Sequence, residues 1–495
     1  MRGRGEKVWR AAVAVALGIP AAWAITALSS GTLLLAIAGL SIAVLMVAIT
    51  RFLPVGVIVV AMLLFRVLMD GETDGGGSSA DLNISVAVAA IALVLAVGTY
   101  LTPGYRARSI LLPAIFVIAW TALSTINYGA DPVVWREGIR ELSILAVAVL
   151  STMLVDRWRR PFFLSNLLLG LVVAPAAAAI LQFATRTGAA IGGELRSFGT
   201  FSHPNAAAPV FGIAVLLSFV LLDVTGKLRY LVLSAFFAVA VFSTGSLTGF
   251  ASTVVMLLAY AVLRPGKTGR KVGIVAVTSI VVLAFVLSPL GQERLAEQAS
   301  FSFDAYGNQD ASASSLGWRL YNWSTLLSRL GESPLVGFGL GSTTTGATAT
   351  GTIPHSEYVR YLFETGILGF SLLLIGIAVL FRHLWRSHRR SGLIVSESLV
   401  GVCIIVGLLV HAATANTVLS TVLMYLVALF IAGSLAHTQQ ETDENGRPSD
   451  YSADRSTEVG SRRRRHMYKG VDPVLPARNP ASDRRSGRAG RPAAW

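Results

Sequence analysis

Charged residues and cysteine are both scarce in this sequence. Only 14% of its 495 residues are charged, whereas a soluble domain of this size carries about 25%. The single cysteine, Cys403, lies inside an apolar run. One cysteine excludes a disulfide within the chain and a metal site built on cysteine ligands.

The chain is instead rich in long apolar runs. Hydrophobic residues make up 54% of the chain, and its mean hydropathy is +0.64. Continuous runs without a period of two disfavour an outer-membrane barrel, and each can cross a hydrocarbon core about 30 Å thick. We expect an all-α polytopic membrane protein with about 14 (12–14) transmembrane helices. They are predicted at 11–28, 32–50, 52–69, 82–101, 109–126, 139–155, 162–183, 206–222, 230–244, 248–263, 272–289, 356–381, 394–412 and 416–436.

The charge of the connecting loops alternates along the chain. Lys and Arg gather at the N-terminus, in the tail and in loops such as 156–161, 264–271 and 382–390. The intervening loops are neutral, acidic or long, and the longest, 290–355, precedes the twelfth span. Because Lys and Arg mark the cytoplasmic side of a membrane, we expect both termini in the cytoplasm and the long loop outside it.

The sequence divides into a membrane domain, 1–436, and a polar tail, 437–495. The tail is rich in Ser, Gly, Pro and Arg, and such a composition predicts a disordered segment. Its arginine run suits anionic membrane lipids. Binding to nucleic acid is not expected, because no aromatic interleaving or folded module accompanies the arginines.

Two of the outward loops contain arginines at unusual places. Arg196 lies close to a span among glycine and apolar residues, where it needs water, a lipid phosphate or a bound anion. Asn205, just before the following span, could cap that helix, with His203 in the same turn. Arg319 lies on a predicted amphipathic helix within SLGWRLYNWSTLLSRLGESP. That helix could lie on headgroups, or place Arg319 over the membrane as an anion clamp.

A glycine-rich segment follows the amphipathic helix. Gly337, Gly339 and Gly341 permit tight turns or a close approach to a ligand. The small, flexible composition of 334–354 would also suit a mobile lid.

Charged residues then cluster where the chain re-enters an apolar span. His355 begins this stretch, and a neutral imidazole can take a proton from a hydroxyl. On a helix, Glu357, Arg360 and Glu364 share one face, so ion pairs Glu357–Arg360 and Arg360–Glu364 are expected to support it.

Four segments, taken in order, resemble the O-antigen ligase and O-antigen polymerase superfamily. They are RSFGTFSHPNAAAP (196–209), GWRLYNW (317–323), SPLVGFGLGS (333–342) and PHSEYVRYLFETGILG (354–369). The resemblance covers about 160–385, and the earlier spans match by hydropathy alone.

The resemblance implies a glycosyltransferase at the outer face of the plasma (inner) membrane. Its donor is a glycan on undecaprenyl diphosphate, its acceptor a glycan, lipid or protein, and it uses neither a metal nor another cofactor. His355 matches the essential loop histidine, and Arg196 and Arg319 match arginines that contact the diphosphate. Two positions depart from the pattern: Ser356 stands where asparagine is common, and Leu247 where an arginine is common.

Other functions remain open at this point. The sequence does not separate a ligase from a polymerase, which differ in their acceptor. A transporter or flippase of lipid-linked sugars would explain the span count and the intramembrane Arg66. A peptidoglycan glycosyltransferase of the shape-and-division type would need an extracellular aspartate, for which Asp304 and Asp310 are the candidates.

Overall fold

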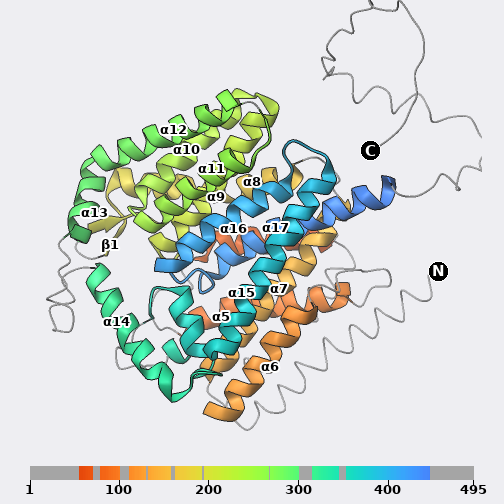
Figure 1. Cartoon of the computed structure of the whole chain (residues 1–495), viewed down its shortest axis with the longest axis vertical. Helices are drawn as coiled ribbons and strands as arrows, with labels where there is room; N and C mark the ends of the chain where they lie inside the picture. Colours follow the sequence, from red (N-terminus) through yellow and green to blue (C-terminus); the bar gives the residue numbers. More distant parts are fainter. Residues whose placement is uncertain are drawn as a thin grey trace, which may run out of the picture. The chain divides into compact units, whose positions relative to one another are not determined.

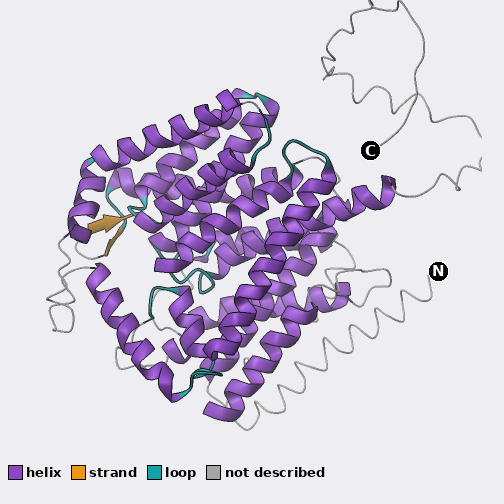
Figure 2. Cartoon of the chain, in the orientation of Figure 1, coloured by secondary structure: helices purple, strands orange, loops and turns teal. Residues whose placement is uncertain are grey.

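Helices dominate the computed structural model, as Figure 2 shows. It describes residues 55–70, 79–100, 111–129, 132–157, 162–191, 194–266, 268–299, 315–344 and 353–445. The expected helical membrane class holds, with one difference. β1 (Ala189–Ile191) and β2 (Glu194–Arg196) form a short antiparallel hairpin, in which Ala189 lies opposite Arg196.

The apolar helices of the described residues coincide with twelve of the predicted spans. Seven are long and apolar enough to cross a membrane: α6 (Leu111–Tyr128), α7 (Pro132–Arg157), α8 (Phe163–Thr185), α9 (Pro204–Thr225), α12 (Thr268–Leu287), α15 (Glu357–Ser391) and α16 (Glu397–Thr414). Five are shorter or less uniformly apolar: α3 (Val55–Leu68), α5 (Ser79–Tyr100), α10 (Leu228–Ser243), α11 (Leu247–Leu263) and α17 (Thr421–Asn445). The spans expected at 11–28 and 32–50 lie outside the described residues, so the total of about 14 stays a prediction.

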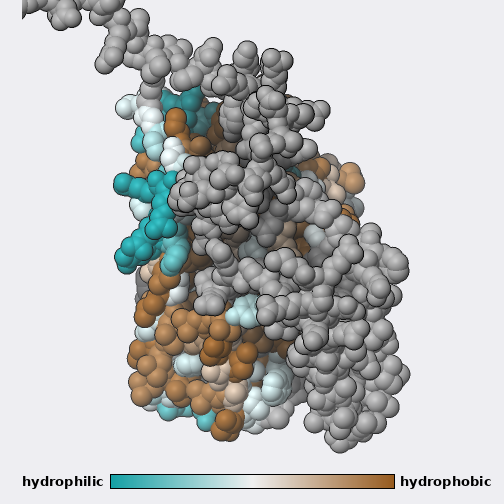
Figure 3. Space-filling model, turned by 90° about the vertical axis from the view of Figure 1, so that its right-hand side faces the viewer, coloured by the Kyte–Doolittle hydropathy of each residue, from teal (hydrophilic) through white to brown (hydrophobic). Residues whose placement is uncertain are grey.

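Peripheral helices expose large apolar side chains. Leu112 and Ile126 of α6 are 75% and 80% exposed, and Ile280 of α12 is 65% exposed. Brown, apolar residues cover much of the described surface in Figure 3. Such a surface fits lipid tails rather than water. By contrast, α9 and α16 are largely buried and lie in the middle of the helices in Figure 1.

Three predicted helix boundaries are wrong, and the first is the start of α7, which lies at Pro132 rather than at 139. The basic stretch 382–390, predicted as a loop, is the end of α15, which stops at Gly392 with φ 65°. His388, Arg389 and Arg390 lie in its last turn, where the helix dipole favours cations. Likewise, α17 continues to Asn445, beyond the expected start of the tail at 437. Residues 446–495 lie outside the described part.

A glycine kink divides α15. Gly366 has φ 62° and ψ −170° inside the helix, a conformation that only glycine adopts readily. The glycine-rich segment packs into the kink: Phe338 N donates to Phe363 O at 2.9 Å, and Ile367 N donates to Pro334 O at 2.9 Å. A side chain at either Gly337 or Gly366 would clash with the backbone of the other segment. The segment up to Thr344 is therefore bonded to α15 in this structure.

The long loop folds into short elements at one end of the bundle. It contains α13 (Pro289–Ala299), which the sequence analysis missed, and α14 (Ser315–Arg329), the predicted amphipathic helix. Two short 3-10 turns follow, η4 (Leu330–Glu332) and η5 (Ser342–Thr344). Figure 1 places β1, α13 and α14 at the same end, which we call the site end. Asp304 and Asp310 lie outside the described residues.

Candidate functional site

His355 precedes α15 in a strained backbone conformation. Its φ is 50°, in the left-handed region that costs an L-residue about 1–2 kcal/mol. The next residue, Ser356, is the N-cap of α15, and its side chain accepts a hydrogen bond from Val359 N. Since serine and asparagine cap helices about equally well, the departure at Ser356 preserves this local structure.

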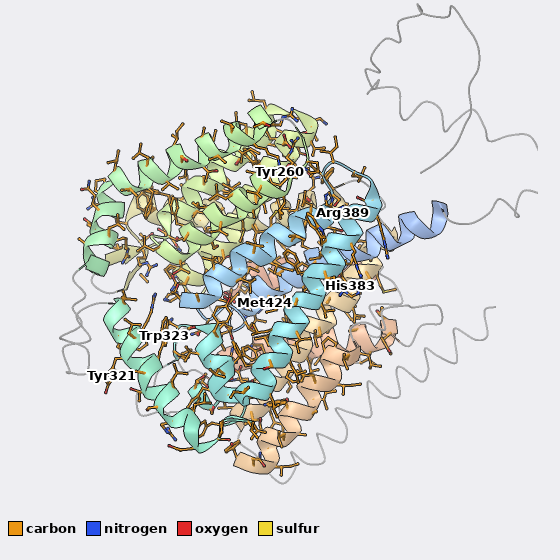
Figure 4. All side chains as sticks on the ribbon, in the orientation of Figure 1. Tyr260, Tyr321, Trp323, His383, Arg389 and Met424 are labelled. Carbon is orange, nitrogen blue, oxygen red and sulfur yellow. The ribbon has the colours of Figure 1, made fainter. Side chains whose placement is uncertain are left out.

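The aromatic face of α14 holds the His355 segment. The Trp323 indole N–H donates to the Pro354 carbonyl, and the Trp318 and His355 ring centroids lie 5.4 Å apart, edge to face. Figure 4 labels Trp323 and Tyr321 on this helix; Tyr321 is 40% exposed. The apolar face that the sequence could assign to headgroups therefore contacts protein at both tryptophans.

Arg196 ends β2, and two of its hydrogen bonds go to neutral oxygens. Its Nε donates to the Thr244 carbonyl at 3.1 Å, and its Nη2 donates to Asn205 Oδ1 at 3.4 Å. Asn205 Oδ1 also accepts from the Ser246 hydroxyl at 2.8 Å. Asn205 thus joins the arginine to the turn between α10 and α11.

The predicted capping role of Asn205 is wrong, because His203 is the N-cap of α9. The His203 ring accepts a hydrogen bond from Asn205 N at Nδ1, 3.0 Å away. Neutral His203 therefore carries its proton on Nε2. The end of α3 also holds the FSHPN turn (201–205). The Thr200 hydroxyl just before the turn donates to the Val67 carbonyl at 2.7 Å, and the Ser202 hydroxyl donates to Asp70 at 3.3 Å.

Electrostatic effects link the predicted site residues Arg196, Arg319 and His355 with His203. Burial, then the charges of Arg196, His355 and Arg319, lower the pKa of His203 to about 4. Burial and the charge of Arg319 lower the pKa of His355 to about 4. Such effects fall off with distance, so these four side chains from β2, the start of α9, α14 and the start of α15 share one environment.

Both imidazoles are consequently neutral near pH 7. His355 can accept a proton from a hydroxyl, and His203 offers an N–H donor from Nε2. The two arginines supply positive charge to this environment, and a guanidinium group can bind phosphate oxygens. The cluster therefore combines a base, a neutral donor and an anion site.

His411 of α16 braces this cluster and was not among the predicted site residues. Its Nε2 lies 3.0 Å from the Asn205 carbonyl oxygen, and its Nδ1 lies 3.0 Å from the Thr417 hydroxyl. A buried histidine inside an apolar span was the available signal, since intramembrane ionisable groups are rarely idle.

A buried charge cluster anchors the start of α15. Arg360 is fully buried, and its guanidinium lies 2.7 Å from Glu357 and 3.3 Å from Glu364. Both predicted ion pairs are confirmed. The cluster also contains Glu137 of α7, 3.0 Å from Arg360, which the sequence analysis assigned to a loop. Its glutamates hold further segments, since Glu364 accepts from the Thr343 hydroxyl and Glu357 from Val418 N.

Comparison with known proteins finds a match to a described family. Residues 230–374 match the family described as O-antigen ligase. The matched region runs from α10 into α15 and contains Arg319 and His355, while Arg196 and His203 precede it. No curated protein matches the chain. The resemblance to the O-antigen ligase and polymerase superfamily is thereby confirmed.

Proposed function

We propose that this chain, a polytopic membrane protein with an O-antigen ligase domain at 230–374, transfers or polymerises glycan from an undecaprenyl-diphosphate-linked donor. The carrying observation is the convergence of His355, Arg319, Arg196 and His203 at the site end. A base for the acceptor and positive charge on the leaving group are what glycosyl transfer from a lipid diphosphate requires.

In the proposed reaction one proton is transferred, one bond forms and one bond breaks. His355 takes the proton of the acceptor hydroxyl as its oxygen bonds to the anomeric carbon of the donor sugar. The bond from that carbon to the diphosphate oxygen breaks, and its electron pair stays on the diphosphate. Arg319 and Arg196 stabilise the negative charge that develops there. His203 Nε2–H is placed to donate to the same group or to the acceptor.

Donor binding would also strengthen the base. Besides burial, the charge of Arg319 lowers the pKa of His355. A diphosphate beside Arg319 offsets that charge, so the His355 pKa rises when the donor is present. The histidine would then be neutral before binding and a better proton acceptor after it.

The outer face of the plasma membrane is the proposed location of the site. The loops at the site end, such as 243–246 and 413–420, contain few Lys or Arg. The opposite ends of the same helices contain basic turns, such as 264–271 and 382–390. This asymmetry supports a cytoplasmic position for the basic ends.

Transport of lipid-linked sugars is the weaker alternative. It was motivated by Arg66, whose guanidinium lies 2.7 Å from Asp70 in a buried ion pair. Asp70 in turn holds Ser202, so this pair supports the FSHPN turn.

Purified protein in vesicles separates the two functions. With a lipid-diphosphate glycan donor and an acceptor glycan, we expect a new glycosidic product, detected by mass spectrometry. Movement of the donor across the bilayer without product would contradict the proposal and favour transport. Accumulation of single repeat units in a deletion strain would indicate a polymerase, and of long lipid-linked chains a ligase.

A further inference from the structure

The outward face of α15 is apolar along one part and basic along the next. Its apolar side chains, between 48% and 57% exposed, are Leu368, Leu372, Ile375 and Val379. The same alternating spacing of four and three residues continues through the exposed side chains of Arg382, Arg386 and Arg389. Since residues three and four apart lie on one side of a helix, these side chains form one continuous surface, which we call the α15 stripe.

The opposite face of this part of α15 packs against the start of α16. Ser387 Oγ lies 3.0 Å from Ser398 Oγ, and His388 Nδ1 lies 3.0 Å from Oγ of Ser396, the N-cap of α16. Leu384, on the same face as Ser387 and His388, is fully buried. These contacts fix the rotation of the helix about its axis, so the arginines of the stripe point away from the protein.

The positive charges of the stripe are not neutralised by the protein. Within the described residues, no carboxylate pairs with Arg382, Arg386 or Arg389. The Arg389 guanidinium lies over the Trp385 ring, 5.7 Å from its centroid, a contact that orients the cation and leaves its charge in place. Figure 4 labels Arg389 and His383 on this part of the helix. Three cations on one side of a helix attract an anion.

The dimensions of the stripe match one leaflet of a bilayer. The rise from Leu368 to Val379 is about 17 Å at about 1.5 Å per residue, close to half of a hydrocarbon core about 30 Å thick. Arg382 and Arg386 lie about 5 Å and about 10 Å beyond Val379, at the level of the headgroups. Leu393 and Ile394, in the turn after α15, are 52% and 63% exposed, as expected of side chains that dip into this boundary.

We propose that the α15 stripe binds an anionic phospholipid of the leaflet opposite the site end. An acyl chain lies along the apolar part, and Arg382, Arg386 and Arg389 bind the phosphate through charge-assisted hydrogen bonds. A soluble anion would use the basic part alone, and an acidic protein would leave the apolar part uncovered. A headgroup without a cation, as in phosphatidylglycerol, suits the stripe better than phosphatidylethanolamine, whose ammonium group the arginines repel.

Native mass spectrometry of the full-length protein in detergent tests the lipid site. The probes are phosphatidylglycerol and phosphatidylethanolamine with the same acyl chains, and we expect the wild type to prefer phosphatidylglycerol. Arg382→Gln combined with Arg386→Gln should weaken phosphatidylglycerol binding about twenty-five-fold, since each basic residue beside an anionic headgroup contributes about fivefold. Lys227→Gln combined with Arg270→Gln is the matched control, because it removes two exposed charges from the same end of the bundle and should bind like the wild type.

Three results would overturn the lipid site. The first is equal phosphatidylglycerol binding by the two double variants, which would mean that any charge at this end suffices. The second is equal binding of the two lipids by the wild type. The third is binding of neither lipid, which would leave the basic part of the stripe to an acidic protein.

Two further measurements separate a lost lipid site from a damaged fold. In detergent without anionic lipid, the stripe variant should unfold at the wild-type temperature, because its arginines make no ion pair within the described residues. Arg382→Lys combined with Arg386→Lys keeps both charges and should bind phosphatidylglycerol within about threefold of the wild type. A loss as large as that of the glutamine variant would contradict charge as the cause. If the double glutamine variant does not fold, Arg386→Gln alone should weaken binding about fivefold, and unchanged binding would overturn the site.

Discussion

At the scale of residues, His355 is a half-buried imidazole whose pKa is lowered by its surroundings. Burial is the larger cause of its lowered pKa and the charge of Arg319 the second. A free-enzyme base with a pKa of about 4 stays unprotonated through the neutral range. The acid limb of kcat/KM should then lie well below the ordinary histidine range, since kcat/KM reports the free enzyme.

The pH profile gives the first prediction. In Arg319→Gln the charge that lowers the His355 pKa is gone, so the pKa rises from about 4 part of the way towards 6.5. The acid limb of kcat/KM should move to higher pH by the same amount, in addition to a loss of rate from weaker donor binding. A wild-type limb already near 6.5, or an unmoved limb in the variant, would show that His355 is not the titrating base.

The residue types at the site were readable from the sequence, but their partners were not. His355, Arg196 and Arg319 stood out because charges beside apolar spans are costly. His203 was read as part of a capping turn, and it is the cap itself. Its second role depends on which groups α14 and α15 bring beside it, and only long-range packing decides that.

At the scale of elements, α15 is two helical segments joined at Gly366. The second prediction is that Gly366→Ala destabilises the protein by about 2 kcal/mol or more, because its φ of 62° is strained for any side chain and a Cβ would meet the Leu335 backbone. The apparent midpoint of thermal unfolding in detergent measures this. Gly376→Ala, in the same helix with open space around it, is the control, and should raise that midpoint slightly. Equal midpoints for the two variants would contradict the account.

The Arg360 cluster gives the third prediction. Arg360→Met leaves Glu137, Glu357 and Glu364 buried together without their common cation, a loss of about 3–5 kcal/mol. Arg386→Met removes an exposed arginine from the same helix and should change the thermal midpoint little. Because the cluster holds the start of α15, glycan transfer should fall with stability in Arg360→Met. A fully stable variant would show that the cluster carries little of the fold.

The ion pairs within α15 were predictable, while the partners from α7 were not. Spacings of three and four residues on one helix fix Glu357–Arg360 and Arg360–Glu364. Glu137 reaches the same guanidinium from a helix 223 positions away in the chain, and no local pattern encodes that contact. α13 was missed for a related reason: its eleven residues, PLGQERLAEQA, are too polar to look like a span. The resemblance implies an arginine at position 247, where this chain has Leu247. The guanidinium of Arg294 in α13 lies close to Gly245, in the turn just before it.

At the scale of the whole molecule, hydropathy predicted the positions of most described helices. Twelve predicted spans coincide with described helices to within a few residues, apart from longer extensions at the start of α7 and at the ends of α15 and α17. Those extensions are polar or basic turns that continue a helix beyond the hydrocarbon, where hydropathy gives no signal. The position of the hairpin and of α13 follows from the turns they pack against, which a one-dimensional profile does not contain.

Orientation in the membrane supplies the fourth prediction. In a Cys403→Ala background, cysteines at Gly331, beside α14, and at Lys227, between α9 and α10, report on opposite ends, and both positions are exposed. A membrane-impermeant maleimide should label Gly331→Cys in intact cells, and Lys227→Cys after permeabilisation alone. The reverse pattern would place the site in the cytoplasm.

Glycan transfer by purified protein tests the central claim most directly. His355→Asn removes the base and keeps the backbone, because asparagine tolerates a φ of 50° better than most residues. With a lipid-diphosphate donor in vesicles, the variant should bind undecaprenyl diphosphate like the wild type and lose about a hundred-fold or more in transfer rate. Transfer at the wild-type rate by His355→Asn would contradict the assignment of His355 as the catalytic base.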